Sequence, residues 1–401
     1  MGAALATLSL AAADAGAAKF PFERAHKYEW RAAGDVLASA DFNGDGHQDL
    51  LLRSSAAAKA PLSLSVRLGQ GGAEFGNARR IVRGVEVKDV AVSNLDRRRG
   101  ADLAIASGGG VQPVVLTTLL GDRGGRFVEA DERTLPFDFP NQGYRPEVEV
   151  ARSAGNRPAL ILRAFAGSDD ASVGSIATDR RGRMGPLVES PLSMPPAFHP
   201  GYGEIPTIGD PMAAGDFNAD GSSDLAFEYF PTQNSRSNGL VVLMLGAPDG
   251  TFAEDVTAAG TVGADGISVA DLNDDGFDDL VTSGSATPQS SVRPYLFMNT
   301  GTADFEAPSG LPNCPFRDYP PPAIADFNGD GHLDIVDPHR ELRASGQCYW
   351  RGRGDGTFAN AIESKPLLAR SIVAGEFDGD RLPDLAISTS NSLVIERNIS
   401  R

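Results

Sequence analysis

The residues best suited to chemistry in this sequence are aspartates at alternate positions of a nine-residue segment. Four copies carry Asp at position 1, Asn at position 3, Asp at position 5, Gly at position 6 and Asp at position 9. A fifth copy keeps the oxygen-bearing side chains but has Arg381 at position 6. We call these segments the Asp loops: Asp41–Asp49, Asp216–Asp224, Asp271–Asp279, Asp326–Asp334 and Glu376–Asp384.

This spacing is typical of a calcium site. Ca²⁺ takes about six to eight hard oxygen ligands, including carboxylates and a backbone carbonyl, and Gly allows the tight turn. We predict Ca²⁺ in the four loops that have Gly and a fifth ion in Glu376–Asp384. The side chains at positions 1, 3, 5 and 9 and the carbonyl at position 7 are the expected ligands. They belong to Asp41, Asn43, Asp45, His47, Asp49, Asp216, Asn218, Asp220, Ser222, Asp224, Asp271, Asn273, Asp275, Phe277, Asp279, Asp326, Asn328, Asp330, His332, Asp334, Glu376, Asp378, Asp380, Leu382 and Asp384.

The alternative interpretation is that the Asp-Gly pairs only form hairpin turns. It leaves unexplained the repulsion among sixteen carboxylates at the ligand positions, which five Ca²⁺ ions would relieve. A sixth copy, Asn94–Asp102, has Arg98 at position 5. The Arg98 guanidinium can replace the metal there by pairing with Asp96 and Asp102, so we predict no calcium in that loop.

The Asp loops are part of a longer repeat. A seventh, fully degenerate copy at Ala151–Ala159 completes a series whose members start 50 to 65 residues apart. Apolar alternation precedes and follows each copy, and a Gly-rich turn with an aromatic residue comes later in most units, as in Gly69–Phe75. This pattern predicts that each unit contains, in order, strand A, the Asp loop, strand B, a loop, strand C, the Gly turn and strand D. Four short strands per repeat of this length indicate a β-propeller blade.

We therefore predict an all-β fold, a seven-bladed β-propeller of four-stranded antiparallel blades with calcium-binding A–B loops. The last unit ends after strand C at Ser392–Glu396, so its missing strand can come from the N-terminal segment that begins at Lys19. Such pairing hides two sheet edges. Residues 19–401 are expected to form this single closed domain. A parallel β-helix is the rival architecture, but its repeats are far shorter.

These segments resemble the FG-GAP/VCBS repeats of the integrin α-subunit propeller and of many secreted bacterial proteins. The resemblance covers nearly the whole chain from about residue 20. It implies that metal loops brace the blades structurally, and we carry this role over to the five Asp loops only. The second and third units depart from the family pattern, which affects the expected calcium there but not the blades.

Composition limits the remaining possibilities. The net charge of −17 argues against a nucleic-acid partner, and no apolar run is long enough for a membrane span. Residues 1–18 resemble the hydrophobic and cleavage regions of a secretory signal, with a disordered Ala-rich tail as the alternative. We therefore expect a secreted, periplasmic or cell-surface protein. Cys314 and Cys348, which we assign to one repeat, can form a single bridge or remain two buried thiols.

Function is expected on the face opposite the Asp loops. Its connections combine Pro with aromatic, Arg and His residues, which are types enriched in recognition surfaces. The first hypothesis is a binding or scaffold module for a glycan or a protein. The alternative is a polysaccharide lyase acting on uronate-containing glycans, which needs a charge neutraliser and a base. Its candidate residues are Tyr144, Arg145, His199, Tyr202, Arg317 and Tyr319.

Overall fold

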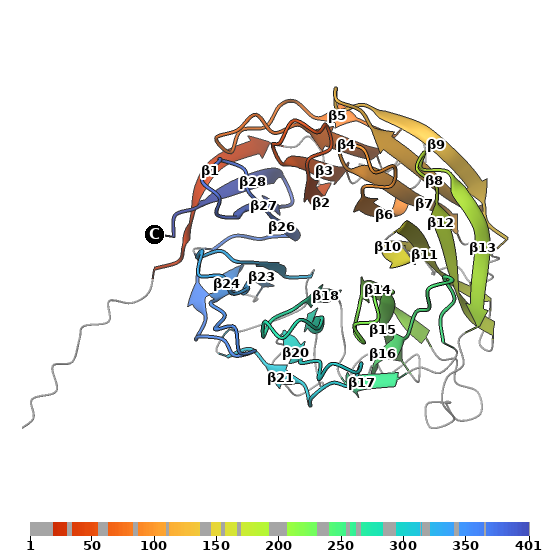
Figure 1. The fold of residues 1–401 in the computed structure, drawn as a ribbon. Helices are drawn as coiled ribbons and strands as arrows, with labels where there is room; N and C mark the ends of the chain where they lie inside the picture. Colours follow the sequence, from red (N-terminus) through yellow and green to blue (C-terminus); the bar gives the residue numbers. More distant parts are fainter. Residues whose placement is uncertain are drawn as a thin grey trace, which may run out of the picture.

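The protein is described by a computed structural model in which strands form a ring (Figure 1). The described residues are 19–29, 34–54, 63–82, 87–109, 112–136, 146–153, 157–166, 170–191, 207–230, 240–253, 257–261, 266–283, 294–312, 314, 321–340, 345–364 and 366–400. They form seven four-stranded antiparallel sheets, which we call blades 1 to 7 in ring order. The expected all-β, seven-bladed propeller is therefore confirmed.

Strands follow one another across each blade from the centre of the ring outward. Blade 1 contains β2 (Gly34–Ala40), β3 (Asp49–Ser54), β4 (Ser63–Arg67) and β5 (Arg79–Arg80), and blade 2 contains β6 (Val87–Ser93), β7 (Asp102–Gly109), β8 (Gln112–Gly121) and β9 (Phe127–Thr134). Blade 3 contains β10 (Glu147–Ser153), β11 (Arg157–Ala166), β12 (Asp170–Thr178) and β13 (Met184–Pro191), and blade 4 contains β14 (Thr207–Gly215), β15 (Asp224–Phe230), β16 (Leu240–Met244) and β17 (Thr257–Thr261).

The remaining blades follow the same order. Blade 5 contains β18 (Gly266–Ala270), β19 (Asp279–Ser283), β20 (Tyr295–Phe297) and β21 (Ser309–Gly310), and blade 6 contains β22 (Ala323–Ala325), β23 (Asp334–Arg340), β24 (Ser345–Trp350) and β25 (Ile362–Glu363). Blade 7 contains β26 (Ser371–Gly375), β27 (Asp384–Ser388), β28 (Ser392–Asn398) and β1 (Phe22–Glu29). In each blade with an Asp loop, the second strand begins at position 9 of that loop.

The hydrophobic core is divided among the spaces between neighbouring blades. Side chains alternate between the two faces of a strand, so Leu51 of β3 packs against blade 2 while Leu50 packs against blade 7. Seven buried clusters result, each filled from two adjacent blades. This arrangement explains why the second strands read as continuous apolar runs, with all five residues of β27 buried.

The ring closes through the two ends of the described chain. β1 pairs antiparallel with β28, with Phe22 opposite Asn398 and Glu29 opposite Ser392. Phe22 is buried and packs edge-on against Phe327 of blade 6, with ring centroids 5.2 Å apart. The N-terminal strand thus supplies both the fourth strand of blade 7 and the aromatic residue that its last unit lacks.

Cys314 and Cys348 form a disulfide, with their Cα atoms 6.5 Å apart. Cys314 follows β21 of blade 5, whereas Cys348 lies on β24 of blade 6. The assignment of both cysteines to one repeat is therefore wrong, because the bond joins two neighbouring blades. Both residues belong to the buried cluster between those blades.

Two other expectations concern the edges of the fold. In blade 3, β10 and β11 of the degenerate copy pair antiparallel, with Ser153 opposite Arg157. Residues 1–18, assigned to a signal or a tail, lie outside the described residues. Within the described part of the chain, no helix is long and apolar enough to cross a membrane.

Candidate metal loops and the joints between blades

The first carboxylate of each Asp loop organises the backbone around it. In blade 1, Asp41 Oδ1 accepts hydrogen bonds from the backbone N–H groups of Gly44 and Asp45 at 2.6 and 3.1 Å. Its Oδ2 accepts from Gly46 N–H at 2.8 Å. Gly46 has a φ of +94°, which a residue with a Cβ rarely adopts. Asp326 of blade 6 repeats all three bonds, and Asp216 and Asp271 repeat two of them.

The last carboxylate of each loop is fully buried and has a structural task of its own. Asp49 Oδ2 accepts from the N–H of Phe42 at 2.9 Å, and its Oδ1 accepts from Gly69 N–H at 2.8 Å. The Asp loop is thereby fixed to the Gly turn of the same blade. The same pair of bonds is made by Asp102, Asp224, Asp279, Asp334 and Asp384. Asp102 makes them in a loop where no calcium is predicted.

Burial and like charge disfavour ionisation of these position-9 carboxylates. Desolvation raises the pKa of Asp49 to about 6, and the charges of Asp45 and Asp41 add to the shift. The same causes raise the pKa of Asp224 and Asp279 to about 6. In blade 7 they raise the pKa of Asp384 to about 7. Each loop therefore holds negative charge that a cation would stabilise.

The donor set of the loops fits Ca²⁺. It consists of hard oxygens, and oxygens that accept a single backbone N–H, such as Asp41 Oδ2 and Asp49 Oδ1, retain a second lone pair. In blade 7, Glu376, Asp378 and Asp384 each offer one oxygen, and the three oxygens lie within 4.8 Å of one another. Among the described residues, no other group of three acidic, His or Cys side chains gathers this closely. In the loops with Gly, position 3 is Asn instead, whose Oδ1 accepts the N–H of position 5.

The loop of blade 2 differs from its expected arrangement in one contact. Arg98 Nε lies 3.4 Å from Asp96 Oδ2, as the pairing hypothesis requires. Asp102, the other expected partner, is instead occupied by the N–H groups of Leu95, Asp96 and Gly121. Asp102 is buried deep in the blade, whereas the Arg98 side chain is mostly exposed, so the two do not meet.

Each Asp loop also forms a joint with the next blade. The carbonyl of Phe217 at position 2 in blade 4 accepts from Asn299 Nδ2 and Ala303 N–H of blade 5 at 2.7 and 3.0 Å. Asn398 Nδ2 bonds to Phe327 O at the joint between blades 6 and 7 in the same way, at 2.6 Å. These two Asn residues were missed by the sequence analysis. They share a position: the N–H of each donates to the position-9 carboxylate of its blade, as the N–H of Gly69 does in blade 1.

Aromatic rings pack across the same joints. The position-2 Phe of one blade meets the Gly-turn Phe of the next, with ring centroids 5.2 to 5.9 Å apart and the rings edge to face. The pairs are Phe42 with Phe127, Phe217 with Phe305, and Phe377 with Phe75. Such pairs add about 0.5–1.5 kcal/mol beyond the area they bury. A metal bound in an Asp loop would thus lie beside the contact between two blades.

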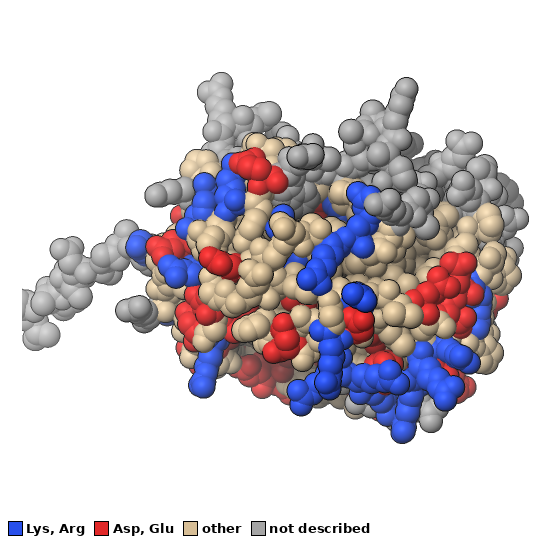
Figure 2. Space-filling model, turned by 90° about the horizontal axis from the view of Figure 1, so that it is seen from above, with Lys and Arg blue, Asp and Glu red and all other residues tan. Residues whose placement is uncertain are grey.

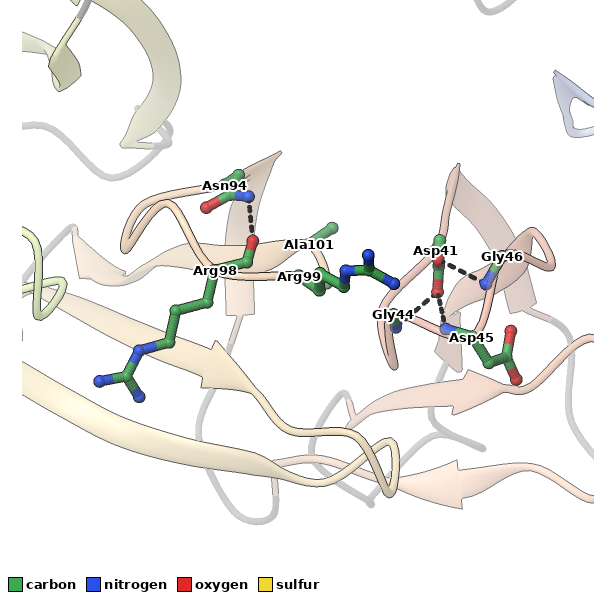
Figure 3. Close-up of a pocket in the computed structure, with 9 residues that line it drawn as sticks. Asp41, Gly44, Asp45, Gly46, Asn94, Arg98, Arg99 and Ala101 are labelled. Carbon is green, nitrogen blue, oxygen red and sulfur yellow. Dashed lines mark hydrogen bonds between the residues drawn. The ribbon is translucent and has the colours of Figure 1, made fainter.

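A pocket of about 560 Å³ opens between the loops of blades 1 and 2 (Figure 3). Asp41, Asp45 and two glycines form one wall, and Asn94, Arg98 and Arg99 form the other. Figure 3 shows the Arg99 guanidinium extending toward the Asp41 loop, while Arg98 extends away from it. The carboxylates of Asp41 and Asp45 accept hydrogen bonds within their own loop, so the Arg99 guanidinium is the cationic group that faces the pocket.

All 25 residues named as calcium ligands are described, and each group of five lies in one loop. The lyase candidates Tyr144, Arg145, His199, Tyr202, Arg317 and Tyr319 all lie outside the described residues. The described parts of the opposite face, such as the turn Thr389–Ser392, include none of these six residues.

The fold and its loops define a class of protein, the seven-bladed β-propellers with acidic loops at the blade joints. No protein-family model matches the chain, and no curated protein matches it. A solved structure of a lectin from Agrocybe aegerita is similar, with a TM-score of 0.53 and 17% identity over 92% of this chain and 87% of that chain. That lectin is described as recognising non-reducing terminal N-acetylglucosamine specifically. At this identity the similarity shows the propeller fold alone.

Proposed function

We propose that this chain is a calcium-stabilised β-propeller that acts outside the cytoplasm as a glycan-binding module of the FG-GAP/VCBS type. The main support for a glycan-binding role is the ring of seven four-stranded blades. This ring is similar over 92% of the chain to a lectin that recognises a sugar. The disulfide between blades 5 and 6 supports a secreted or periplasmic location, because such bonds persist in oxidising compartments.

The proposed glycan site is on the face opposite the Asp loops. On the Asp-loop face, the position-1 and position-9 carboxylates and the turn residues hold loops and blades together. Some connections on the opposite face are longer than the nine-residue Asp loops. Residues 192–206 join β13 to β14, and residues 284–294 join β19 to β20. Long loops on a rigid scaffold are where binding residues concentrate. Bracing and recognition are thus assigned to opposite faces.

The test is capture of the full chain by immobilised glycans in calcium-containing buffer. A panel of neutral glycans, including chains that end in N-acetylglucosamine, is compared with uronate-containing polysaccharides. We expect saturable binding to a subset of the panel, with competition by the free sugar. Absence of binding across the panel would reject the glycan ligand.

The same mixtures separate a binding module from a lyase. Ultraviolet absorbance is followed with time for each uronate-containing polysaccharide, because β-elimination creates a carbon–carbon double bond. A binding module gives a flat trace while it still binds glycan. A steady rise would replace this proposal by a lyase, and the variants His199→Ala and Tyr202→Phe would then be tested first.

A further inference from the structure

Blades 2 and 3 carry an unusual concentration of arginine on the Asp-loop face. The three connections that contribute are the loop before β7, the turn before β9 and the turn before β13. They present eight exposed arginines, which we call the arginine sector: Arg97, Arg98, Arg99, Arg123, Arg126, Arg180, Arg181 and Arg183. Lys and Arg side chains gather along one edge of the view in Figure 2. The corresponding loops of blades 1, 4, 5, 6 and 7 are acidic.

The fold brings these three connections together although they are far apart in the sequence. Asp102 Oδ1 accepts from Gly121 N–H at 2.9 Å, which fixes the loop of blade 2 against the turn of the same blade. Thr118 Oγ1 of β8 donates to Gly182 O at 2.7 Å, which fixes the turn of blade 3 against blade 2. The sequence shows Arg97–Arg99 and Arg180–Arg183 only as two short, separate basic runs, and the ring brings them to one surface.

The acidic residues within these turns leave most of the positive charge uncompensated. Asp122 and Asp179 each accept two backbone N–H groups of their own turn, and these bonds lower the pKa of both carboxyls. Within these two turns, two negative charges stand against the five arginines Arg123, Arg126, Arg180, Arg181 and Arg183. Arg98 meets Asp96 through Nε, which leaves its two terminal nitrogens free. Among the described residues, Arg99 has no ion-pair partner.

The pocket between blades 1 and 2 gives this charge a defined site. Arg98 and Arg99 line it, and its volume of about 560 Å³ lies within the usual range for small-molecule sites. Gly44 fits closely against Arg99, since a Cβ on Gly44 would lie 3.0 Å from Arg99 Cβ. From this pocket the arginine sector continues along the turns of blades 2 and 3.

We propose that the pocket and the arginine sector bind an anionic polysaccharide, one that carries sulfate groups or uronate carboxylates. A guanidinium donates two parallel hydrogen bonds to a carboxylate or sulfate, which gives direction as well as charge. One acidic sugar would occupy the pocket against Arg99, and anionic groups further along the chain would meet Arg98 and the arginines of the two turns. This site goes beyond the proposed function because it lies on the opposite face.

Other polyanions fit the surface less well. Single-stranded nucleic acid binds through bases stacked on exposed aromatic rings, and the described residues of the arginine sector include no exposed aromatic ring. A folded protein partner needs a contact core poor in charge, which this surface does not offer.

The test is fluorescence anisotropy of labelled sulfated dextran and of labelled oligogalacturonate, with neutral dextran as reference and calcium in excess. The variant R98A/R99A is compared with K19A/R351A, which removes two exposed positive charges outside blades 2 and 3. We expect the native chain to bind at least one of the anionic probes and not neutral dextran. R98A/R99A should weaken that binding about tenfold or more and lower the salt dependence by about two counterions. K19A/R351A should bind as the native chain does.

Three results would overturn the site: no binding of either anionic probe, equal weakening in both variants, or tighter binding of a DNA duplex through the same two arginines. Melting curves of the variants check that each is folded. The neutral-glycan capture described above is repeated with R98A/R99A. Loss of polyanion binding in R98A/R99A with neutral-glycan capture intact would support this site independently of the proposed function.

Discussion

At the scale of single residues, Arg381 occupies a backbone conformation that Gly holds in the other Asp loops. Its φ is +79°, against +84° to +94° for Gly46, Gly221, Gly276 and Gly331 at the same position. A side chain costs free energy in this left-handed region. We therefore expect Arg381→Gly to raise the free energy of unfolding by about 1 kcal/mol, measured by urea denaturation in excess calcium.

Two variants control for charge and for position. Arg381→Ala removes the charge but keeps the strain, so it should leave stability nearly unchanged, because Arg381 is exposed. Gly331→Ala introduces the strain into blade 6 and should lower stability by a similar amount. A stability gain in Arg381→Ala equal to that in Arg381→Gly would assign the effect to charge instead of backbone strain.

A second residue-scale prediction concerns Asp337 on β23. Its carboxyl is buried, its Oδ2 has no hydrogen-bond partner, and desolvation raises its pKa well above the usual value. The folded state therefore holds a proton that the unfolded state has released above about pH 4. Stability from this group falls as the pH rises from there toward the folded pKa.

Asp337→Asn removes this titration while keeping the shape of the side chain. The difference in melting temperature, variant minus native, should become more positive between pH 4.5 and pH 8, by no more than the equivalent of about 1.4 kcal/mol per pH unit. Any constant penalty for the buried amide cancels in this comparison. A difference that does not change with pH would show that Asp337 is ionised or solvated in the folded protein.

At the scale of strands and blades, the disulfide between Cys314 and β24 ties blades 5 and 6, which also meet through the hydrogen bond from Trp350 Nε1 to Pro312 O. It closes a loop over a sequence separation of 34. In the chain-entropy account such a bond stabilises by about 3–4 kcal/mol. The double variant C314S/C348S should lose about that much free energy of unfolding in chemical denaturation. Unfolded, unreduced native protein should show no free thiol on titration, and two thiols would contradict the bond.

How far the sequence predicts these elements depends on whether a signal lies within one repeat. The strands, the Asp loops and the closing strand follow from apolar alternation and from the spacing of Asp41–Asp49 and its copies. The joints do not, because a repeat read alone cannot show that Phe305 of one unit meets Phe217 of the previous unit. The same reason hides the arginine sector.

The Asp loops show a different kind of ambiguity. Position 9 is a predicted calcium ligand, and the structure gives it a second reason to be Asp, since it fixes the loop to the Gly turn of its blade or, in blade 7, to Asn398 of β28. Asp102 retains this task without a predicted metal. One residue type can thus satisfy two demands, and spacing alone does not separate them.

At the scale of the whole molecule, calcium would act on the ring because the Asp loops lie at the joints between blades. Binding to the folded state alone adds stability by mass action, about 2.7 kcal/mol per site when free calcium is 100 times the dissociation constant. We expect excess chelator to lower the melting temperature of the native chain in calorimetry. An unchanged melting curve would reject structural calcium.

Matched variants connect this effect to individual loops. Asp220→Ala should lose one bound ion by elemental analysis and reduce the response to chelator. Asp102→Ala should keep the native metal content although it is destabilised, since it leaves the N–H groups of Leu95 and Gly121 unpaired. Metal loss in Asp102→Ala would place an ion in blade 2.

The dependence of this response on pH follows from the same carboxylates. Metal ligands must be deprotonated, and burial raises the pKa of Asp49, Asp224, Asp279 and Asp334 to about 6 when no cation is bound. Below that pH, protons compete with calcium and also relieve the repulsion that calcium would relieve. The drop in melting temperature caused by chelator should therefore be largest above pH 7 and shrink toward pH 5. A drop that stays constant over this range would mean that the position-9 carboxylates are not ligands, and that calcium binds the ring through positions 1, 3 and 5 alone.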